Sequence, residues 1–374
     1  MADAMGPRER WWAFRNRWLR SPRFRAWASA AWFTRPIARR RALAAFDLCA
    51  GFVYSQVLLA CVRLRLLDVL AERAQSLPVI ARRVSLPEAA AGRLLDAAVA
   101  LDLASRLPDG RYTLGEVGAA IADEAGILAM VEHHALLYDD LRDPVALLRG
   151  AGADTRLSGF WAYAADHAPG RIADDRVASY TALMAASQPL VAAEVLAAYD
   201  FRRHRRVLDV GGGAGAFLCA VGAAAPAAEL VLFDLPPVAE RAQAAFEAAG
   251  LAGRARSVGG DFLRDPLPRG ADVATLVRIL HDHDDAAALT LLRAIRAALP
   301  AGGTLLIAEP MSEAPGARRM GDAYFGFYLL AMGRGRPRTP AAVAALLQTA
   351  GFARAAPVAT RMPLLTGLVV ARAG

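Results

Sequence analysis

The sequence predicts a two-domain α/β protein in which a mostly helical N-terminal domain precedes a domain built on a parallel sheet. Three observations support this prediction. From about residue 204 onward, short apolar strands alternate with helical stretches, which is the pattern of βαβ units. Residues 207–217 have the pattern of a buried strand, a glycine-rich turn and the start of a helix. The chain has 374 residues, enough for two domains with separate cores.

A basic, tryptophan-rich arm at residues 1–45 comes first. The eleven arginines of residues 1–46 are opposed only by Asp3 and Glu9, so this segment has a net charge of about +9. The whole chain has a net charge of +8, so the rest of the chain has about −1. It also holds five of the six tryptophans. Such a segment is typical of a membrane-surface contact, a nucleic-acid contact or a contact with a partner subunit. Tryptophans favour the membrane interface and no nucleic-acid motif follows, so we expect membrane or subunit contact and no nucleic acid.

Residues 46–197 are expected to form a helical dimerisation and substrate domain. A long helix is predicted over 46–71, and two short helices joined by a turn are predicted over 77–103. Asp109-Gly110 predicts the turn of a small β-hairpin. This order is that of a winged helix. The helix that would read DNA carries few cations, so a dimerisation module is the better interpretation than a DNA-binding regulator.

The sequence also predicts the compartment. The apolar stretch 48–62 is expected to be a core or interface helix that is too short to cross a membrane. The N-terminus lacks the apolar region of a secretory signal. Cys49, Cys61 and Cys219 have neither metal-site nor disulfide spacing, which suits a reducing cytoplasm. We therefore expect a cytoplasmic protein, peripheral on the membrane face if the arm contacts lipid.

Residues 198–374 are expected to form the sheet domain. Thr339-Pro340 predicts the start of the last helix, as N-cap and first helical residue. Strands 353–360 and 362–371 follow with a link of one or two residues, which permits only an antiparallel pair. The five strands before them are expected at 206–210, 229–234, 255–258, 272–279 and 303–308.

The glycine turn indicates the ligand. Gly211, Gly213 and Gly215 let the backbone turn tightly and approach a bound molecule. Asp209 stands two positions before the first glycine, where a carboxylate would repel a pyrophosphate and attract the sulfonium and ammonium groups of S-adenosylmethionine. The glycines together with Ala216 also satisfy the dinucleotide fingerprint, so a nicotinamide oxidoreductase remains an alternative.

Further cofactor-binding residues are expected at the ends of the following strands. Asp234 lies about twenty residues past the glycines, where an acid can bind ribose hydroxyls; its alternative is a helix N-cap. Gly260 and Asp261 precede Phe262, so that the acid could accept a hydrogen bond from an adenine amino group and the ring could stack on the base. Arg278 is expected to brace the cofactor pocket, with a surface salt bridge as the alternative.

The catalytic candidates follow the fourth strand. His281 stands where strand ends face the ligand crevice, and an imidazole suits a general base near neutral pH. Glu309 ends the fifth strand and is expected to orient and polarise His281. His283 adds no metal site, because residues 281–283 are too closely spaced to converge on an ion and no other ligand cluster exists.

These motifs resemble a known family. Asp-x-Gly-Gly-Gly at 209–213, Phe-Asp-Leu-Pro at 233–236, Gly-Gly-Asp-Phe at 259–262 and Arg-x-Leu-His-Asp at 278–282 are similar to O-methyltransferases of the acetylserotonin and caffeate type. The resemblance implies a class I methyltransferase Rossmann-like sheet of five parallel strands plus a terminal antiparallel hairpin, a winged-helix-like dimerisation domain, a homodimer, S-adenosylmethionine, and His281 as proton acceptor. The sequence departs from the family pattern in one place. Plant members have a second acid beside the histidine, and the corresponding position here falls near Pro337, so that acid is missing.

Three longer segments, 46–56, 138–149 and 321–339, are similar to the bacterial O-methyltransferases of carotenoid biosynthesis. This similarity implies a small lipophilic acceptor, methylated at the C1 hydroxyl of an acyclic carotenoid of the demethylspheroidene or hydroxyneurosporene type. A bacteriochlorophyll precursor, a quinone or a phenolic compound is the alternative acceptor. The residues expected to contact the substrate, of which the apolar ones are equally explicable as core, are His134, Tyr138, Trp161, Met184, Tyr324, Phe327 and Met332.

Overall fold

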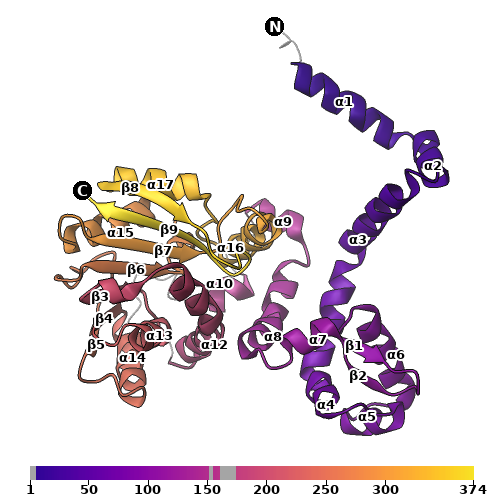
Figure 1. Cartoon of the computed structure of the whole chain (residues 1–374), viewed down its shortest axis with the longest axis horizontal. Coiled ribbons are helices and arrows are strands. Elements are labelled where there is room, and N and C mark those ends of the chain that lie inside the picture. The colour runs from indigo at the N-terminus through magenta and orange to yellow at the C-terminus, as the bar shows by residue number, and fades with distance from the viewer. Residues whose placement is uncertain (1–5, 151–154, 161–173) are drawn as a thin grey trace. The chain divides into compact units, whose positions relative to one another are not determined.

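The computed structural model describes residues 6–150, 155–160 and 174–374 (Figure 1). Contacts between residues divide the chain into two compact units, Met1–Ala120 and Ile121–Gly374. Each unit is described by itself. The segment 121–197, which was expected to belong to the helical domain, has its contacts with the unit that contains the sheet.

The first unit is helical with one small hairpin. Strands β1 (Ala104–Arg106) and β2 (Tyr112–Leu114) pair antiparallel, and Gly110 in their turn has φ +83°, so the predicted hairpin is confirmed. The two short helices are also confirmed as α5 and α6. The helices are α1 (Pro7–Arg20), α2 (Pro22–Ala30), α3 (Arg35–Arg63), α4 (Leu66–Glu72), α5 (Leu77–Arg83), α6 (Glu88–Ala100) and α7 (Glu116–Ile121).

Helix α3 corrects one prediction. The stretch 48–62 was expected to be a helix too short to cross a membrane, but it is the C-terminal half of a 29-residue helix that continues into the arm. Pro36 lies in the first turn, where a proline does not interrupt the helix. By length and composition α3 could cross a membrane, and only 11% of its apolar window is buried within the structure. Its buried residues, Leu59 and Cys61, lie near its end.

The second unit is built on a seven-stranded sheet of order β5-β4-β3-β6-β7-β9-β8. The first five strands in this order are parallel, and β9 joins the sheet antiparallel to both β7 and β8. The predicted parallel sheet with a terminal antiparallel hairpin is therefore confirmed. The strands are β3 (Arg206–Val210), β4 (Glu229–Asp234), β5 (Ala255–Gly259), β6 (Val273–Val277), β7 (Thr304–Glu309), β8 (Phe352–Val358) and β9 (Gly367–Ala373).

Helices cover both faces of this sheet, so that the central strands are buried on both sides (Figure 1). On β3, Val207 packs with the helices of one face and Leu208 with those of the other, as the two-residue period of a strand requires. One face is covered by α12 (Asp174–Ala198), α13 (Ala216–Ala224) and α14 (Pro236–Ala248). The other is covered by α15 (Asp285–Ala298) and α17 (Pro340–Thr349).

Helix α17 begins as predicted. The hydroxyl of Thr339 accepts a hydrogen bond from the N–H of Ala342 at 3.0 Å, and Pro340 is the first helical residue. The loop between the last two strands is longer than the expected one or two residues. Residues 359–366 separate β8 from β9. Pro363 cannot donate to a strand ladder, and the Leu365 N–H closes a turn on the Met362 carbonyl at 2.9 Å.

A set of helices lies beside the sheet in the second unit. Gly126 of α8 lets this helix approach α12 closely, since a Cβ there would lie 2.6 Å from the Ala186 carbonyl oxygen. A cluster of buried residues that includes Leu137, Leu147, Leu157 and Tyr328 holds the set together. Its helices are α8 (Ala125–Asp140), α9 (Pro144–Leu148), α10 (Arg156–Phe160), the π-helix η4 (Arg319–Phe325) and α16 (Gly326–Met332).

Candidate active site

The glycine turn after β3 has the open conformation that the sequence suggests. Gly211, Gly213 and Gly215 all have positive φ, between +59° and +82°. A Cβ at Gly211 would lie 2.6 Å from Ile279, whereas a Cβ at Gly213 would meet no atom within 4 Å. The turn is therefore packed at its base and open at Gly213, where its backbone can face a ligand.

Asp209 lies beneath this turn and is almost fully buried. Its Oδ1 accepts a hydrogen bond from the Thr275 hydroxyl at 2.6 Å, while its Oδ2 has no hydrogen-bond partner within the described part of the chain. Burial raises the pKa of Asp209 to about 7, although the bond from Thr275 opposes this shift. A buried carboxylate oxygen without a partner favours a ligand that brings a donor or a positive charge.

Asp234, at the end of β4, holds the turn from the other side. Its Oδ2 accepts from the Gly213 N–H at 2.8 Å and its Oδ1 from the Leu235 N–H at 2.7 Å. Burial raises the pKa of Asp234 to about 6, against the effect of these two bonds. The carboxylate therefore lies next to the glycine backbone and not at the start of a helix, because Leu235 is the N-cap of α14.

The third predicted ligand-binding segment follows β5. The N–H of Gly260 donates to the Asp234 carbonyl at 2.9 Å, which ties this loop to β4. Asp261 accepts a hydrogen bond from the Leu263 N–H through one oxygen, and its other oxygen lies 3.5 Å from Arg264. The ring of Phe262 is half-buried and meets the His283 ring edge-on at 5.5 Å.

His281 lies in a short 3-10 turn, η3 (Leu280–Asp282), which follows β6. Its side chain is 5% exposed, and its Nε2 lies 3.2 Å from Oδ1 of Asp282. Its Nδ1 has no hydrogen-bond partner among the described residues. Burial, together with the charge of Arg278, lowers the pKa of His281 to about 3, so that the imidazole is neutral at physiological pH and able to accept a proton.

Glu309, at the end of β7, contacts the histidine differently from the expectation. Its Oε2 accepts from the backbone N–H of His281 at 3.0 Å, and its Oε1 has no partner in the described part of the chain. The acid that faces the imidazole is Asp282, whose pKa is raised by burial and by the nearby Glu309. Burial raises the pKa of Glu309 to about 7. Glu309 thus fixes the backbone of the turn, and Asp282 is the carboxyl next to the ring.

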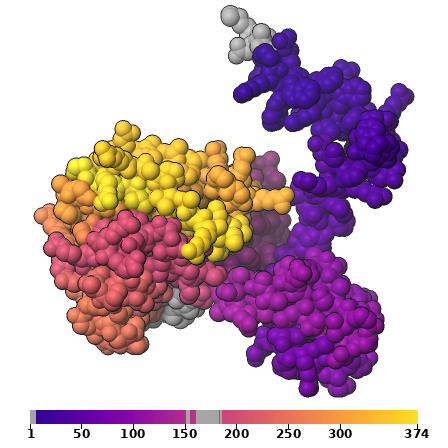
Figure 2. Space-filling model, viewed as in Figure 1, coloured from indigo at the N-terminus to yellow at the C-terminus, as the bar shows by residue number. Residues whose placement is uncertain are grey.

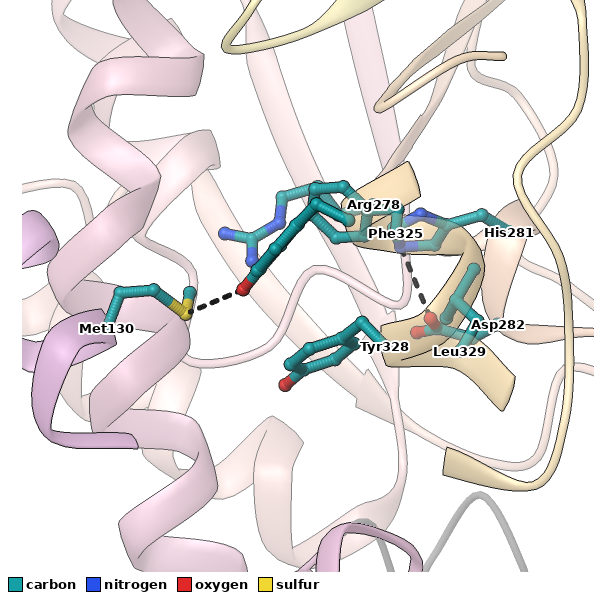
Figure 3. A pocket seen from close by; sticks show the side chains of 8 residues that line it. Met130, Arg278, His281, Asp282, Phe325, Tyr328 and Leu329 are labelled. Atoms are coloured by element: carbon teal, nitrogen blue, oxygen red, sulfur yellow. Dashed lines mark hydrogen bonds and ion pairs between the residues drawn. The ribbon is translucent and has the colours of Figure 1, made fainter. Parts of the chain in front are cut away.

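Arg278 connects the end of β6 to α12. Its backbone has φ +61°, and its N–H donates to the Ala308 carbonyl at 2.8 Å. Its guanidinium donates to the Ser187 hydroxyl at 2.7 Å and forms part of the wall of the His281 pocket (Figure 3). Its alternative as an ordinary surface salt bridge finds no support in these contacts.

Arg338 supports the site in a way that the sequence did not reveal. It is 2% exposed, and it donates to the carbonyls of Leu280 at 2.8 Å and His283 at 2.7 Å. It also donates to the Asp285 carboxylate at 2.8 and 3.0 Å. One guanidinium thus fixes both ends of the turn that carries His281. The only available signal was the run of glycine and arginine at 333–338, and a repeat of arginines gives no indication of which one is buried.

The pocket beside His281 is small and mostly apolar (Figure 3). Its volume is about 20 Å³, roughly enough for one water molecule. Any larger acceptor must therefore displace side chains in order to reach the imidazole. The pocket is lined by Met130, Arg278, His281, Asp282, Tyr324, Phe325, Tyr328 and Leu329.

Two adjacent histidines of α8 bind two tyrosines of this pocket. His133 Nε2 lies 2.7 Å from the Tyr328 hydroxyl, and His134 Nε2 lies 2.6 Å from the Tyr324 hydroxyl. Burial lowers the pKa of both imidazoles, to about 4 for His133, so neutral rings make these bonds. Tyr324 also lies 3.8 Å from the Met130 sulfur. These pairs fix the tyrosines that close the pocket.

The other residues expected to contact substrate are more scattered. Tyr138 lies beside His134, with ring centroids 6.2 Å apart. Phe327 is half-buried and is not one of the residues that line the pocket, and Met332 is 3% exposed in the core cluster of α16. Trp161 lies outside the described residues. Met184 lies on α12, but its side chain is not part of the structure described.

Together the fold and these contacts define an α/β enzyme with a ligand site at the carboxyl edge of its parallel sheet. Comparison with known proteins identifies its family. Residues 138–353 match the O-methyltransferase domain, and residues 46–123 match the O-methyltransferase dimerisation domain. The chain therefore belongs to the O-methyltransferase family, and its dimerisation domain supports a homodimer.

Two relatives carry the same name. The chain is 46% identical over 332 residues to demethylspheroidene O-methyltransferase of Cereibacter sphaeroides, which covers 89% of this chain and 87% of that relative. It is 42% identical over 342 residues to demethylspheroidene O-methyltransferase of Rhodobacter capsulatus, and the match covers 90% of this chain and 84% of that relative. The solved structure of human N-acetylserotonin methyltransferase in complex with SAM has the same fold, with a TM-score of 0.74 at 24% identity over 90% of this chain and 98% of that one.

The arrangement around Arg338 yields a prediction. Arg338→Met should lower the free energy of unfolding by about 2–4 kcal/mol, because two buried carbonyls lose their donor. The matched control is Arg336→Met. Arg336 binds the same Asp285 but is 63% exposed, so its loss should cost about 0.5 kcal/mol or less. Urea unfolding followed by circular dichroism measures both changes, and equal effects of the two substitutions would contradict this role of Arg338.

Proposed function

We propose that this enzyme transfers a methyl group from S-adenosylmethionine to the C1 hydroxyl of an acyclic carotenoid, with His281 as the general base. The observation that carries the catalytic part is the buried imidazole, whose Nδ1 has no partner among the described residues while Nε2 faces Asp282. The support for the acceptor comes from the two relatives named for demethylspheroidene, each matched over about nine-tenths of this chain.

The residues at the carboxyl edge fit S-adenosylmethionine. Bound there, it supplies a methyl group on a positively charged sulfur. The unpartnered Oδ2 of Asp209 and the open backbone at Gly213 suit the amino-acid end of this molecule. Asp234 can accept from ribose hydroxyls, and Asp261 with Phe262 can bind adenine. The acids Asp209 and Asp234 beside the glycine turn disfavour a pyrophosphate. The alternative that this protein is a nicotinamide-dependent oxidoreductase therefore has little support.

In this proposal His281 removes the proton from the hydroxyl group of the acceptor. An aliphatic alcohol is a weak acid, so its proton must leave while the new carbon–oxygen bond forms. With a proton on Nε2 directed at Asp282, Nδ1 has a free lone pair to receive the acceptor's proton. The imidazolium that results keeps its Nε2–H directed at Oδ1 of Asp282, 3.2 Å away. Glu309 and Arg338 hold the backbone of this turn in place.

The acceptor must enter through the aromatic side of the pocket. Phe325 and Tyr328 lie beside the small space next to His281 (Figure 3), and Tyr324 also lines it. These three rings offer apolar surface to a lipophilic molecule. A bacteriochlorophyll precursor, a quinone or a phenol would contact the same aromatic residues, so these residues do not distinguish the acceptors. A long polyene dissolves in bilayers, so we place the enzyme on the cytoplasmic membrane face, with the basic arm as its contact.

Substitution of the general base should separate binding from turnover. His281→Ala is expected to lower kcat by a factor on the order of 10² or more, because the proton then has no acceptor. Its affinity for S-adenosylhomocysteine, measured by calorimetry, should stay within about threefold of the original.

His204→Gln is the matched control. The side chain of His204 is 8% exposed, but this histidine lies two residues before β3, where its Nε2 binds the Tyr199 hydroxyl at 2.7 Å. It should retain most of the turnover. Near-normal turnover of His281→Ala would refute the general-base role.

The raised pKa values of the two acids predict how cofactor affinity depends on pH. Both Asp209 (pKa about 7) and Asp234 (pKa about 6) lose negative charge as pH falls. Asp209 then attracts the ammonium group of the ligand less, and Asp234 accepts weaker hydrogen bonds from the ribose hydroxyls. Affinity for S-adenosylhomocysteine should weaken on the order of tenfold between pH 8 and pH 5.5. Asp234→Asn should weaken binding at pH 8 and flatten this dependence. Calorimetry across the pH range would contradict the assignment if the unaltered enzyme bound equally well throughout.

The acceptor can be identified directly. Incubation with isotope-labelled S-adenosylmethionine and a set of candidate acceptors, followed by mass spectrometry, should label an acyclic carotenoid alcohol at its hydroxyl oxygen. A quinone, a phenol and a bacteriochlorophyll precursor serve as the competing acceptors. Labelling of one of these, with the carotenoid alcohol unlabelled, would leave the methyltransferase assignment intact and overturn the carotenoid assignment.

A further inference from the structure

The N-terminal helices carry a continuous row of aromatic rings. Five successive ring pairs, from residue 11 to residue 33, have centroids 5.5–6.1 Å apart. Helices α1 and α2 bury no residue, and Figure 2 shows them in indigo. Trp11 is 60% exposed and Trp27 is 51% exposed. We call this row the aromatic ladder; it consists of Trp11, Phe14, Trp18, Phe24, Trp27 and Phe33.

Arginines flank the ladder on α1. Trp11, Phe14 and Trp18 share one stripe of the helix because they recur at three- and four-residue intervals. By the same geometry, Arg8 and Arg15 border one side of the stripe, and Arg10 and Arg17 border the other. The guanidinium of Arg15 lies 4.4 Å over the ring of Trp12. An apolar stripe edged on both sides by arginines is the design of a helix that lies in a bilayer interface.

The positive charge of residues 6–46 indicates which kind of molecule binds the aromatic ladder. Between residues 6 and 46 there are eleven arginines and a single acid, Glu9, whose carboxylate accepts from the Gly6 N–H. A two-fold contact in which this segment packs on the same segment of a second copy would bring arginine against arginine. Anionic lipid headgroups neutralise the arginines while the acyl region accepts the rings.

Nucleic acid would neutralise the arginines but leaves the ladder without a suitable partner. Ring pairs such as Trp18–Phe24 and Trp27–Phe33 are edge-on, at 78° and 74°. The rings already pack on one another and do not present successive flat faces for bases. Bilayer immersion makes no such geometric demand, because it requires only apolar area next to positive charge.

A membrane-crossing α3 is also disfavoured. Residues Leu59 and Cys61 of this helix are buried in the first unit, and four arginines occupy its first two turns at 35–41. The stretch left between them, residues 42–58, is at the lower limit of the roughly 17–25 residues that span a bilayer, and it contains Asp47.

We propose that residues 6–46 form an in-plane membrane anchor that binds anionic phospholipid bilayers. The aromatic ladder enters the boundary of the acyl chains, and the flanking arginines bind the lipid phosphates. This proposal deepens the membrane-surface location given under the proposed function and does not depend on which acceptor is methylated.

The experiment is vesicle sedimentation of the full-length enzyme. Binding to vesicles of phosphatidylglycerol mixed with phosphatidylcholine should exceed binding to pure phosphatidylcholine on the order of tenfold or more, and added salt should reduce it. Two variants test the two parts of the anchor. The ladder variant combines Trp11→Ala, Trp18→Ala and Trp27→Ala; the charge variant combines Arg10→Gln, Arg15→Gln, Arg17→Gln and Arg20→Gln.

Each variant should lose binding by a factor on the order of ten or more. The matched control replaces four exposed arginines of the second unit and should bind normally: Arg256→Gln, Arg269→Gln, Arg293→Gln and Arg361→Gln. All variants should bind S-adenosylhomocysteine normally by calorimetry, which shows that the site is folded. A failure to methylate carotenoids would leave the sedimentation result unaffected, so the two proposals can fail separately.

Four outcomes would overturn the anchor. They are equal binding to neutral and anionic vesicles, resistance to extraction by alkaline carbonate as for a spanning helix, dissociation of the dimer in the ladder variant without loss of vesicle binding, and tighter binding to an oligonucleotide than to anionic vesicles at the same salt concentration.

Discussion

The carboxyl edge of the parallel sheet concentrates buried ionisable groups, and the rest of the site depends on this. The order β4-β3-β6-β7 brings together the acids that end β4, β3 and β7 and the histidine turn after β6. Asp209, His281 and Glu309 each have one buried atom without a partner among the described residues. An unpaired buried polar atom costs about 1–3 kcal/mol, and the fold retains these three at the carboxyl edge of the sheet, where a ligand can satisfy them.

Burial moves these groups toward their neutral forms. The pKa of Asp209 rises to about 7 and that of Glu309 to about 7, while that of His281 falls to about 3. A cationic methyl donor bound at this edge favours ionisation of the acids beside it. The same burial keeps the imidazole unprotonated, which leaves a lone pair on Nδ1. The neutral forms of the acids and of the imidazole thus have one physical origin, which is exclusion of water from the strand ends.

Sequence patterns predicted the parts of this structure that depend on local chemistry. The strands, the glycine turn, the Asp109-Gly110 hairpin and the Thr339 cap each follow from residues close together in the chain. The length of α3 was underestimated because only its apolar stretch was counted, whereas the helix continues through Asp47 to Arg35. The Arg338 contacts and the binding of His133 and His134 to tyrosines of η4 and α16 join residues far apart in sequence, so only tertiary packing reveals them.

The central claim is that His281 is a neutral, buried imidazole that accepts the proton. Nitrogen-15 NMR of the enzyme labelled at histidine tests this most directly, with the His281 resonances assigned by their absence in His281→Asn. We expect a neutral ring, protonated at Nε2 and unprotonated at Nδ1, that does not titrate between pH 5 and pH 8. An imidazolium that titrates near the ordinary histidine value of about 6.5 would contradict it.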